Sequence, residues 1–157
     1  MNSNNKLIVF SDGAARGNPG PAGAGGLVRA RKNQEILAKT CEYLGEKTNN
    51  VAEYMALLLT LNQARQWPTA ELEIFADSEL MVRQLNGVYR VKDATLKLLY
   101  QRVNLILQDF PRTSITYVPR EKNKEADALA NEAIEAYLRG KKREIDITDL
   151  GGPMSLL

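Results

Sequence analysis

The chain has 157 residues, of which 44% are hydrophobic and 25% are charged, and this composition is typical of a single globular domain. Its 21 basic and 19 acidic side chains leave a formal charge of +2, which is too small to indicate a nucleic-acid partner by itself. Histidine is absent and Cys41 is the single cysteine, so the sequence excludes an internal disulfide, a Cys/His zinc site and a hydrolase with a catalytic histidine.

The amino terminus, MNSNN, is polar, and the apolar run behind it is only as long as a strand. Neither feature is typical of a secretory signal or a membrane span. We therefore expect a cytoplasmic protein, and we expect it to be a monomer.

Three apolar segments open the chain, at residues 6–12, 23–32 and 35–44, and predict a meander of antiparallel strands. From Asn50 the apolar residues cover more than one helical face until the segment ends before Pro68. This pattern predicts a central helix that packs on a sheet.

The remainder of the chain alternates helices and strands. Residues 71–77 and 114–119 predict strands, and helices are predicted for residues 78–87, 93–110 and 123–140. The order β-β-β-α-β-α-α-β-α predicts an α/β fold with a five-stranded mixed sheet. Its first three strands are antiparallel, and later strands are parallel because helical crossovers join them.

We assign this fold to a domain of residues 1–140 and treat residues 141–157 as a C-terminal tail. The tail loses the helical pattern and collects glycine, proline and mixed charge. Its apolar end, MSLL, could dock on a partner or on the domain itself.

Four acids stand at predicted strand ends or helix starts: Asp12, Glu53, Asp77 and Asp127. Each has an ordinary explanation. Asp12 and Asp77 could terminate strands, Glu53 fits a capping box with Asn50, and Asp127 complements a helix N-terminus.

Taken together the four acids indicate a site, because strand ends and helix starts of an α/β sheet face one crevice. Clustered carboxylates need cations, and oxygen ligands without His or Cys favour Mg²⁺ or Mn²⁺.

Four segments, in this order and spacing, resemble the type 1 ribonuclease H family over about residues 6–139: FSDGAARGNPGPAGAGG, TNNVAEYMALL, IFADSELMVRQL and VPREKNKEADALANEA. The resemblance implies a ribonuclease H-like fold. It also implies hydrolysis of the RNA strand of an RNA–DNA hybrid, which leaves 3′-hydroxyl and 5′-phosphate ends. The cofactor implied is Mg²⁺, with Mn²⁺ as a substitute, and two ions are bound with the substrate.

The resemblance implies a role for each acid. Asp12 would bridge both ions, and Glu53 and Asp77 would complete the ligand shell of one of them. Asp127 would help to hold the ion that activates the attacking water. Two ions arranged in this way promote in-line displacement at phosphorus.

The glycine-rich loop after Asp12 is expected to let the backbone approach a nucleic-acid strand closely, which a side chain would block. The resemblance places this loop and Asn49 and Asn50 near RNA 2′-hydroxyls, and Thr48 near a DNA phosphate. Asn49 and Asn50 could instead cap a helix. The expected substrate-binding residues are Gly17, Asn18, Gly20, Thr48, Asn49, Asn50, Ser78, Arg83, Tyr89 and Arg120.

The sequence departs from the family pattern at two places. Many members have a histidine in the loop before the last helix, and here Arg120 is the substitute that could hold a phosphate but could not shuttle protons. It could also be a solvated surface charge. Some members have a basic protrusion that is absent here, and Arg83, Arg90 and Lys92 with Tyr89 could form a smaller DNA-binding surface. Tyr89 could equally pack between helices.

Three functions stay open at this point. The first is a metal-dependent endoribonuclease that acts on RNA–DNA hybrids. The second is a catalytically silent nucleic-acid-binding protein of the same fold, although none of the expected acids is missing. The third is a nuclease that also cleaves double-stranded RNA, which the sequence does not separate from the first.

Overall fold

The computed structural model describes residues 5–140 of the chain. Within that range the elements follow the order predicted from the sequence, with an additional 3-10 turn at Arg120–Lys122. The predicted tail, residues 141–157, lies outside the described residues. The elements are β1 (Lys6–Ala15), β2 (Gly20–Ala30), β3 (Ile36–Lys47), α1 (Asn49–Ala64), β4 (Glu71–Ala76), α2 (Glu79–Leu85), α3 (Ala94–Leu107), β5 (Thr113–Tyr117) and α4 (Lys124–Leu138).

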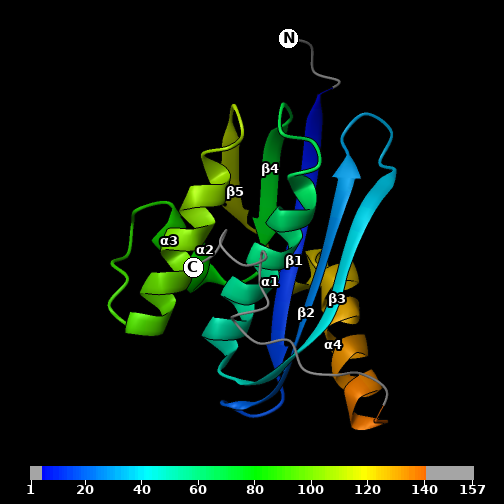
Figure 1. The fold of residues 1–157 in the computed structure, drawn as a ribbon, viewed down its shortest axis with the longest axis vertical. Helices are drawn as coiled ribbons and strands as arrows, with labels where there is room; N and C mark the ends of the chain where they lie inside the picture. The colour runs from blue at the N-terminus through cyan, green and yellow to red at the C-terminus, as the bar shows by residue number, and fades with distance from the viewer. Residues whose placement is uncertain (1–4, 141–157) are drawn as a thin grey trace.

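The strands form a mixed sheet in the order β3-β2-β1-β4-β5 (Figure 1). β1 lies at its centre and pairs antiparallel with β2 and parallel with β4. β3 runs antiparallel to β2, and β5 runs parallel to β4, so the sheet is antiparallel on one side of β1 and parallel on the other. The structure therefore confirms the predicted five-stranded mixed sheet.

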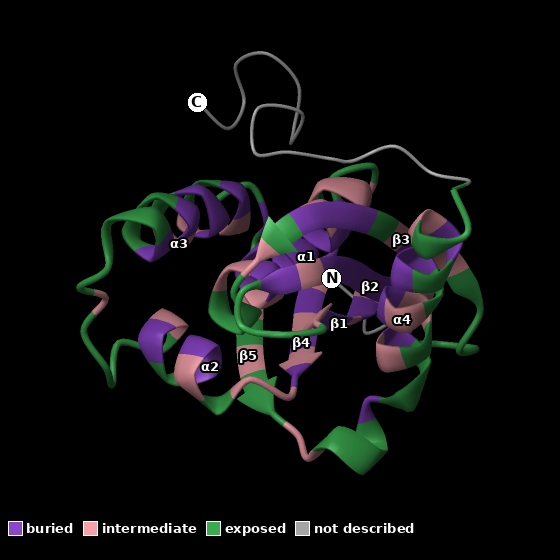
Figure 2. Cartoon of the chain, turned by 90° about the horizontal axis from the view of Figure 1, so that it is seen from below, coloured by how far each residue is buried: buried purple, intermediate pink, exposed green. Residues whose placement is uncertain are grey.

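Helices α1 and α4 pack on opposite faces of the sheet. Adjacent residues of a strand point to opposite faces. On β2, a Cβ at Gly25 would overlap the backbone of α4, whereas a Cβ at Gly26 would overlap the Thr60 side chain of α1. Figure 2 shows α2 and α3 gathered toward β5, while α4 lies toward β2 and β3.

The first strand is longer than the sequence predicted, and this changes the place of Asp12. The prediction that the strand ends at Asp12 is wrong, because β1 continues to pair with β2 through Ala15. Its last pair with β4 is Ser11 with Ala76. Asp12 is therefore the first residue of β1 beyond the end of β4, and the connection to β2 shortens to residues 16–19.

The start of α1 also differs from the prediction. The N-cap is Thr48, whose side chain accepts a hydrogen bond from Val51 N at 3.3 Å. Because the first turn of α1 contains no acid, the capping box predicted for Asn50 and Glu53 is wrong. The Glu53 carboxylate lies further along the helix and has other partners.

The core is built around α1, as the sequence predicted for its central helix. Tyr54 is fully buried on α1, and its hydroxyl donates a hydrogen bond to Gln84 Oε1 of α2 at 2.7 Å. None of the helices in the described part of the chain is long and apolar enough to cross a membrane. The buried residues of α1 are Ala52, Tyr54, Met55, Ala56, Leu57, Leu58, Thr60, Leu61 and Ala64.

Replacing Gly25 with valine should destabilise the fold, because the new side chain would overlap the backbone of α4 at Ala126. Overpacking costs about 1–3 kcal/mol and more when backbone must move, so the thermal midpoint should fall by roughly 5 °C or more. The control is Gly140→Ala, whose added methyl group meets no atom within 4 Å. It should cost about 1 kcal/mol for its left-handed backbone conformation. Equal midpoints in thermal unfolding would contradict the close approach of α4.

Candidate active site

Three carboxylates from separate elements converge where β1 passes the end of β4. Asp12 lies on β1, Glu53 on α1 and Asp77 directly after β4, and one carboxylate oxygen of each lies within 4.8 Å of the others. Asp12 is buried, with 5% of its surface exposed, and the other two are half-buried. The structure thus brings together three of the four acids that the sequence singled out.

Glu53 reaches this cluster because α1 touches β1 at Gly13. A Cβ at Gly13 would overlap the backbone carbonyl of Ala52, so this approach requires glycine. The Glu53 carboxylate then lies beside the strand, where Gly13 N donates a hydrogen bond to Glu53 Oε1 at 3.1 Å. The strand backbone therefore orients one acid next to Asp12.

Asn123 connects Asp77 to β1. Its Nδ2 donates hydrogen bonds to Asp77 Oδ2 at 3.2 Å and to the carbonyl oxygen of Ser11 at 2.9 Å. The residue is 2% exposed, and its side chain makes no capping bond although it precedes α4. Asn123 was not among the predicted site residues, because an asparagine directly before a helix is ordinarily a cap.

Asp127 lies in the first turn of α4 and stands outside the 4.8 Å cluster. It lies close enough to Asp12 to act on that carboxyl group, because Asp127 is among the causes that raise the pKa of Asp12, after burial and the charges of Glu53 and Asp77. One turn further along α4, Asn131 Nδ2 donates to Asp127 Oδ1 at 3.2 Å and to the Asp127 carbonyl oxygen at 3.0 Å. The fourth acid thus lies near Asp12, and its partner Asn131 was not among the predicted site residues.

Ionisation of all the acids of the cluster at once is unfavourable. Burial is the largest cause that raises the pKa of Asp12 to about 10, followed by the charges of Glu53 and Asp77. Burial and then the charge of Asp77 raise the pKa of Glu53 to about 8, although the hydrogen bond from Gly13 N acts against this shift. Two neighbouring acids therefore favour their neutral forms at neutral pH when no cation is bound.

A bound cation reverses that preference, because its charge stabilises the ionised carboxylates. The metal ligands that the cluster offers are carboxylate oxygens, and the chain has no histidine. Hard divalent ions take oxygen ligands of this kind. The buried acidic cluster is therefore consistent with the use of a divalent metal.

The loop between β1 and β2 lies against the start of α1. Asn18 Oδ1 accepts a hydrogen bond from Asn49 N at 2.9 Å. Gly17 has a φ of +105°, a conformation that side-chain-bearing residues rarely adopt. The structure thus brings Gly17 and Asn18 of one motif beside Thr48, Asn49 and Asn50 of another.

Three residues predicted to bind substrate have roles in the fold itself. Gly20 is buried at the start of β2, and a Cβ there would overlap the Arg16 carbonyl, so packing within the loop requires this glycine. Thr48 caps α1. Ser78 caps α2, its hydroxyl accepting from Met81 N at 3.2 Å. Substrate binding by these residues stays a prediction.

Arg120 begins the 3-10 turn between β5 and α4 and is exposed. Its positive charge acts to lower the pKa of Glu53. This is the smallest of the influences on the pKa of Glu53, so substrate binding by Arg120 stays a prediction.

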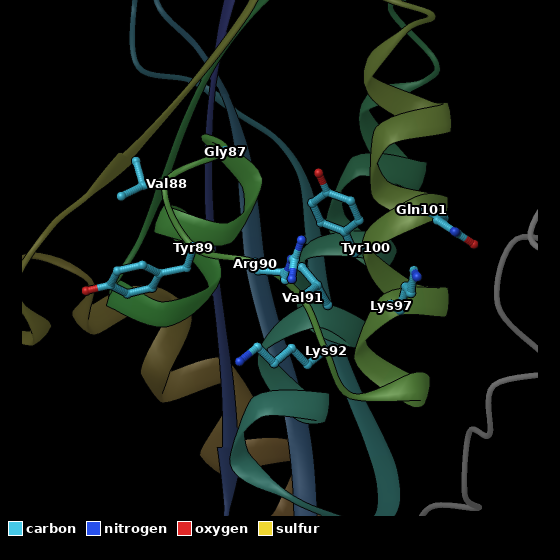
Figure 3. Close-up of a pocket in the computed structure, with 9 residues that line it drawn as sticks. All are labelled: Gly87, Val88, Tyr89, Arg90, Val91, Lys92, Lys97, Tyr100 and Gln101. Atoms are coloured by element: carbon cyan, nitrogen blue, oxygen red, sulfur yellow. The ribbon is translucent and has the colours of Figure 1, made fainter.

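The connection between α2 and α3 forms a hollow basic surface (Figure 3). Residues 87–92 and the first half of α3 line a cavity of about 780 Å³. Arg90 and Lys92 supply cations from the connection, and Lys97 supplies one from α3. None of the four acids lines this cavity, so the basic surface is a separate feature.

Tyr89 belongs to this surface and does not pack between helices. It is 46% exposed, and Arg83 Cζ lies 5.6 Å from the centre of its ring. Arg83 also forms an ion pair with Glu79, with 2.9 Å between Nε and Oε2. Part of the positive charge predicted for this surface is therefore already balanced.

The chain is similar to a known protein family and to several named proteins. The family model described as reverse transcriptase-like matches residues 10–133. The bifunctional protein Rv2228c of Mycobacterium tuberculosis is 37% identical over 141 residues, which cover 90% of this chain and 39% of that protein. The ribonuclease HI of Halobacterium salinarum is 42% identical over 130 residues, which cover 83% of this chain and 65% of that protein. The chain thus spans less than two thirds of either relative.

Solved structures agree with these relatives. The crystal structure of LC11-RNase H1, isolated from compost, in complex with an RNA/DNA hybrid has a TM-score of 0.80 and 43% identity. The match covers 85% of this chain and 99% of that chain. The chain therefore belongs to the reverse transcriptase-like family, and its relatives place it among the type 1 ribonuclease H proteins.

Proposed function

We propose that the protein is an endoribonuclease that hydrolyses the RNA strand of RNA–DNA hybrids and leaves 3′-hydroxyl and 5′-phosphate ends. The observation that carries the proposal is the convergence of Asp12, Glu53 and Asp77, with Asp127 against Asp12. The chain is 43% identical to LC11-RNase H1, whose structure was solved with an RNA/DNA hybrid. That likeness supports the hybrid as substrate.

The four acids would hold two Mg²⁺ ions, or Mn²⁺ in their place, when the hybrid is bound. Asp12 is the buried centre of the group, and Glu53, Asp77 and Asp127 would supply the other ligands. Divalent ions held here would supply positive charge that lowers the pKa of the attacking water and stabilises the charge that develops on the phosphate.

The chain's own contribution is to fix the acids before substrate arrives. The N–H of Gly13 orients Glu53, and the Asn123 amide orients Asp77. Removal of such supporting hydrogen bonds typically lowers metal affinity or activity by about 10–100-fold. Groups held in place do not have to reorganise during the reaction, which is the main source of electrostatic catalysis.

The hybrid would be recognised beside the acids by the β1–β2 loop and the start of α1. The side chains of Asn49 and Asn50 are exposed there, and such amides can bond to the 2′-hydroxyls that distinguish RNA from DNA. The Asn18–Asn49 hydrogen bond keeps the two segments together. The residues of this surface are Gly17, Asn18, Gly20, Thr48, Asn49 and Asn50, and Ser78 stays a predicted contact beside Asp77.

The basic surface of the α2–α3 connection would contact the DNA strand. Arg90, Lys92 and Lys97 can neutralise phosphates, and the exposed Tyr89 ring can pack on a sugar or base. The Arg83 guanidinium lies over the Tyr89 ring. This arrangement would substitute for the basic protrusion that the chain lacks.

Cleavage of double-stranded RNA and binding without cleavage remain the alternative functions. A comparison of RNA–DNA hybrid, RNA duplex and DNA duplex of one sequence, with and without Mg²⁺, separates them on a gel. We expect the RNA of the hybrid alone to be cut, and only with Mg²⁺ present. Cutting in the presence of EDTA, or equal cutting of the RNA duplex, would contradict the proposal. The cytoplasmic location, the monomeric state and docking by the tail stay predictions.

Glu53→Gln should abolish most activity while stabilising the metal-free protein at alkaline pH. The pKa of Glu53 is raised to about 8 in the folded protein, whereas the ordinary value is 4.5. The neutral carboxyl group is therefore compatible with the fold at acid pH, and this contribution to stability is lost as the pH rises through about 8 and the buried group must ionise. The parent's thermal midpoint in EDTA should therefore fall between about pH 5 and about pH 9, and the variant's should fall less. Hybrid cleavage should drop about 100-fold or more.

The control for Glu53→Gln is Glu132→Gln, which removes one exposed acid of α4. It should follow the parent in both the pH profile of unfolding and the cleavage rate. A Glu53→Gln variant with near-parental activity would remove Glu53 from the proposed site.

Arg120→Ala should slow turnover more than it weakens hybrid binding. The guanidinium acts on Glu53 and could hold a phosphate oxygen, so we expect kcat to fall about tenfold, the scale of one charge-assisted contact, with little change in KM. Lys122→Ala removes an exposed cation from the same turn and serves as the control. Parental kcat in Arg120→Ala would identify Arg120 as a solvated surface charge.

A further inference from the structure

A chain of hydrogen bonds runs from the β1–β2 loop to Asp127 through one side chain of α4. Arg16 Nη2 donates to Asn131 Oδ1 at 3.1 Å, and Asn131 Nδ2 donates to Asp127 Oδ1 at 3.2 Å. Arg16 is anchored a second time, because its Nη1 pairs with Glu135 Oε2 at 2.6 Å. The proposed function gives no role to Arg16, and Asn131 has so far been only a hydrogen-bond partner of Asp127.

The two neighbours of Asn131 fix the orientation of its amide. A guanidinium has donors and no acceptor, so it must face Oδ1, and an ionised carboxylate has acceptors and no donor, so it must face Nδ2. Rotation of the amide by 180° would turn like groups toward each other on both sides. Arg16 therefore holds Asn131 in the orientation that donates to Asp127.

The opposite end of this connection is the loop proposed to read the hybrid. Arg16 directly precedes Gly17 and Asn18, and Asn18 bonds to the start of α1 through Asn49 N. The loop is thus tied to α4 on one side and to α1 on the other. Both helices carry acids of the site, Asp127 on α4 and Glu53 on α1.

A local role for Asn131 is the simpler alternative. Asparagine in a helix often bonds to the carbonyl oxygen four residues earlier, and Asn131 does so at Asp127 O. That bond alone would leave the Asp127 carboxylate without support from Asn131. The bond to Oδ1 and the bond from Arg16 are the features that a local role does not require.

We propose that Asn131, held by Arg16, is a positioning residue that fixes the Asp127 carboxylate for metal binding and connects it to the hybrid-reading loop. This inference rests on the proposed function, in which Asp127 holds a divalent ion. One Asp127 oxygen is restrained by the Asn131 amide, so the carboxylate cannot rotate freely about its last bond. Hydrogen bonds of this kind to metal-binding carboxylates restrict their orientation and support metal affinity.

The test uses Asn131→Leu, which removes the amide, keeps a similar volume and leaves the net charge unchanged. Glu135→Gln is the matched control, since it weakens the other anchor of Arg16 on the same helix and does not touch Asp127. Four quantities are measured for the parent and both variants. They are the Mn²⁺ dissociation constant of the free protein by calorimetry, kcat and KM for the hybrid at saturating Mg²⁺, and the thermal midpoint in EDTA.

We expect Asn131→Leu to bind Mn²⁺ about tenfold more weakly and to lose about 10–100-fold in kcat, with KM within about twofold of the parent. Its thermal midpoint in EDTA should match that of Glu135→Gln, because both residues lie at the helix surface. Glu135→Gln should keep parental Mn²⁺ affinity and kcat. If Asn131→Leu does not fold, Asn131→Ala takes its place with the same expectations.

Parental Mn²⁺ affinity and kcat in Asn131→Leu would overturn the inference. Equal losses in Asn131→Leu and Glu135→Gln would also overturn it, because Glu135→Gln leaves the bonds of Asn131 to Arg16 and to Asp127 in place. If the parent cleaves no hybrid, the proposed function fails, and a tenfold loss of Mn²⁺ affinity restricted to Asn131→Leu would still support the positioning role. Failure of the two ideas is thus distinguishable.

Discussion

The close approach of two helices to the backbone of the central strands governs the geometry of this protein. α1 touches β1 at Gly13, and α4 touches β2 at Gly25, where a Cβ would overlap the helix backbone in each case. Glu53 and Asp127 are carried toward Asp12 by these two contacts, from opposite faces of the sheet. A larger residue at either glycine would move an acid away from the others, because cores do not absorb added volume without shifts.

The close approach of the helices also brings carboxyl groups of like charge together where they are buried from water. Asp12 is nearly fully buried, and the neutral forms of Asp12 and Glu53 are favoured because burial and neighbouring carboxylates raise the pKa of each group. A divalent ion relieves this conflict by neutralising the cluster. The fold thus holds a binding site whose electrostatics favour a cation, while the N–H of Gly13 and the amide of Asn123 keep the oxygens in place.

Polar contacts connect the acids to the loop that we propose reads the hybrid. Asn18 ties the β1–β2 loop to α1, and Arg16 ties it to α4 through Asn131. Several residues predicted to read substrate, such as Thr48 and Ser78, also cap helices that carry or follow site acids. Fold and site are therefore not separable here, since Thr48 starts the helix that carries Glu53 and Ser78 starts the helix that follows Asp77.

The sequence by itself determined the order of the elements, the mixed sheet and the identity of the four acids, because periodicity, turn residues and short motifs are local signals. It could not determine where β1 ends, since that depends on pairing with β2 beyond the end of β4. It also left a helix cap open as an alternative role for Glu53, because the hydrogen-bond partner of this side chain, Gly13 N, lies 40 positions away. Asn123 bonds to Asp77 across 46 positions. Such contacts are set by strand register and helix packing, so only the tertiary structure decided which side chains support the acids.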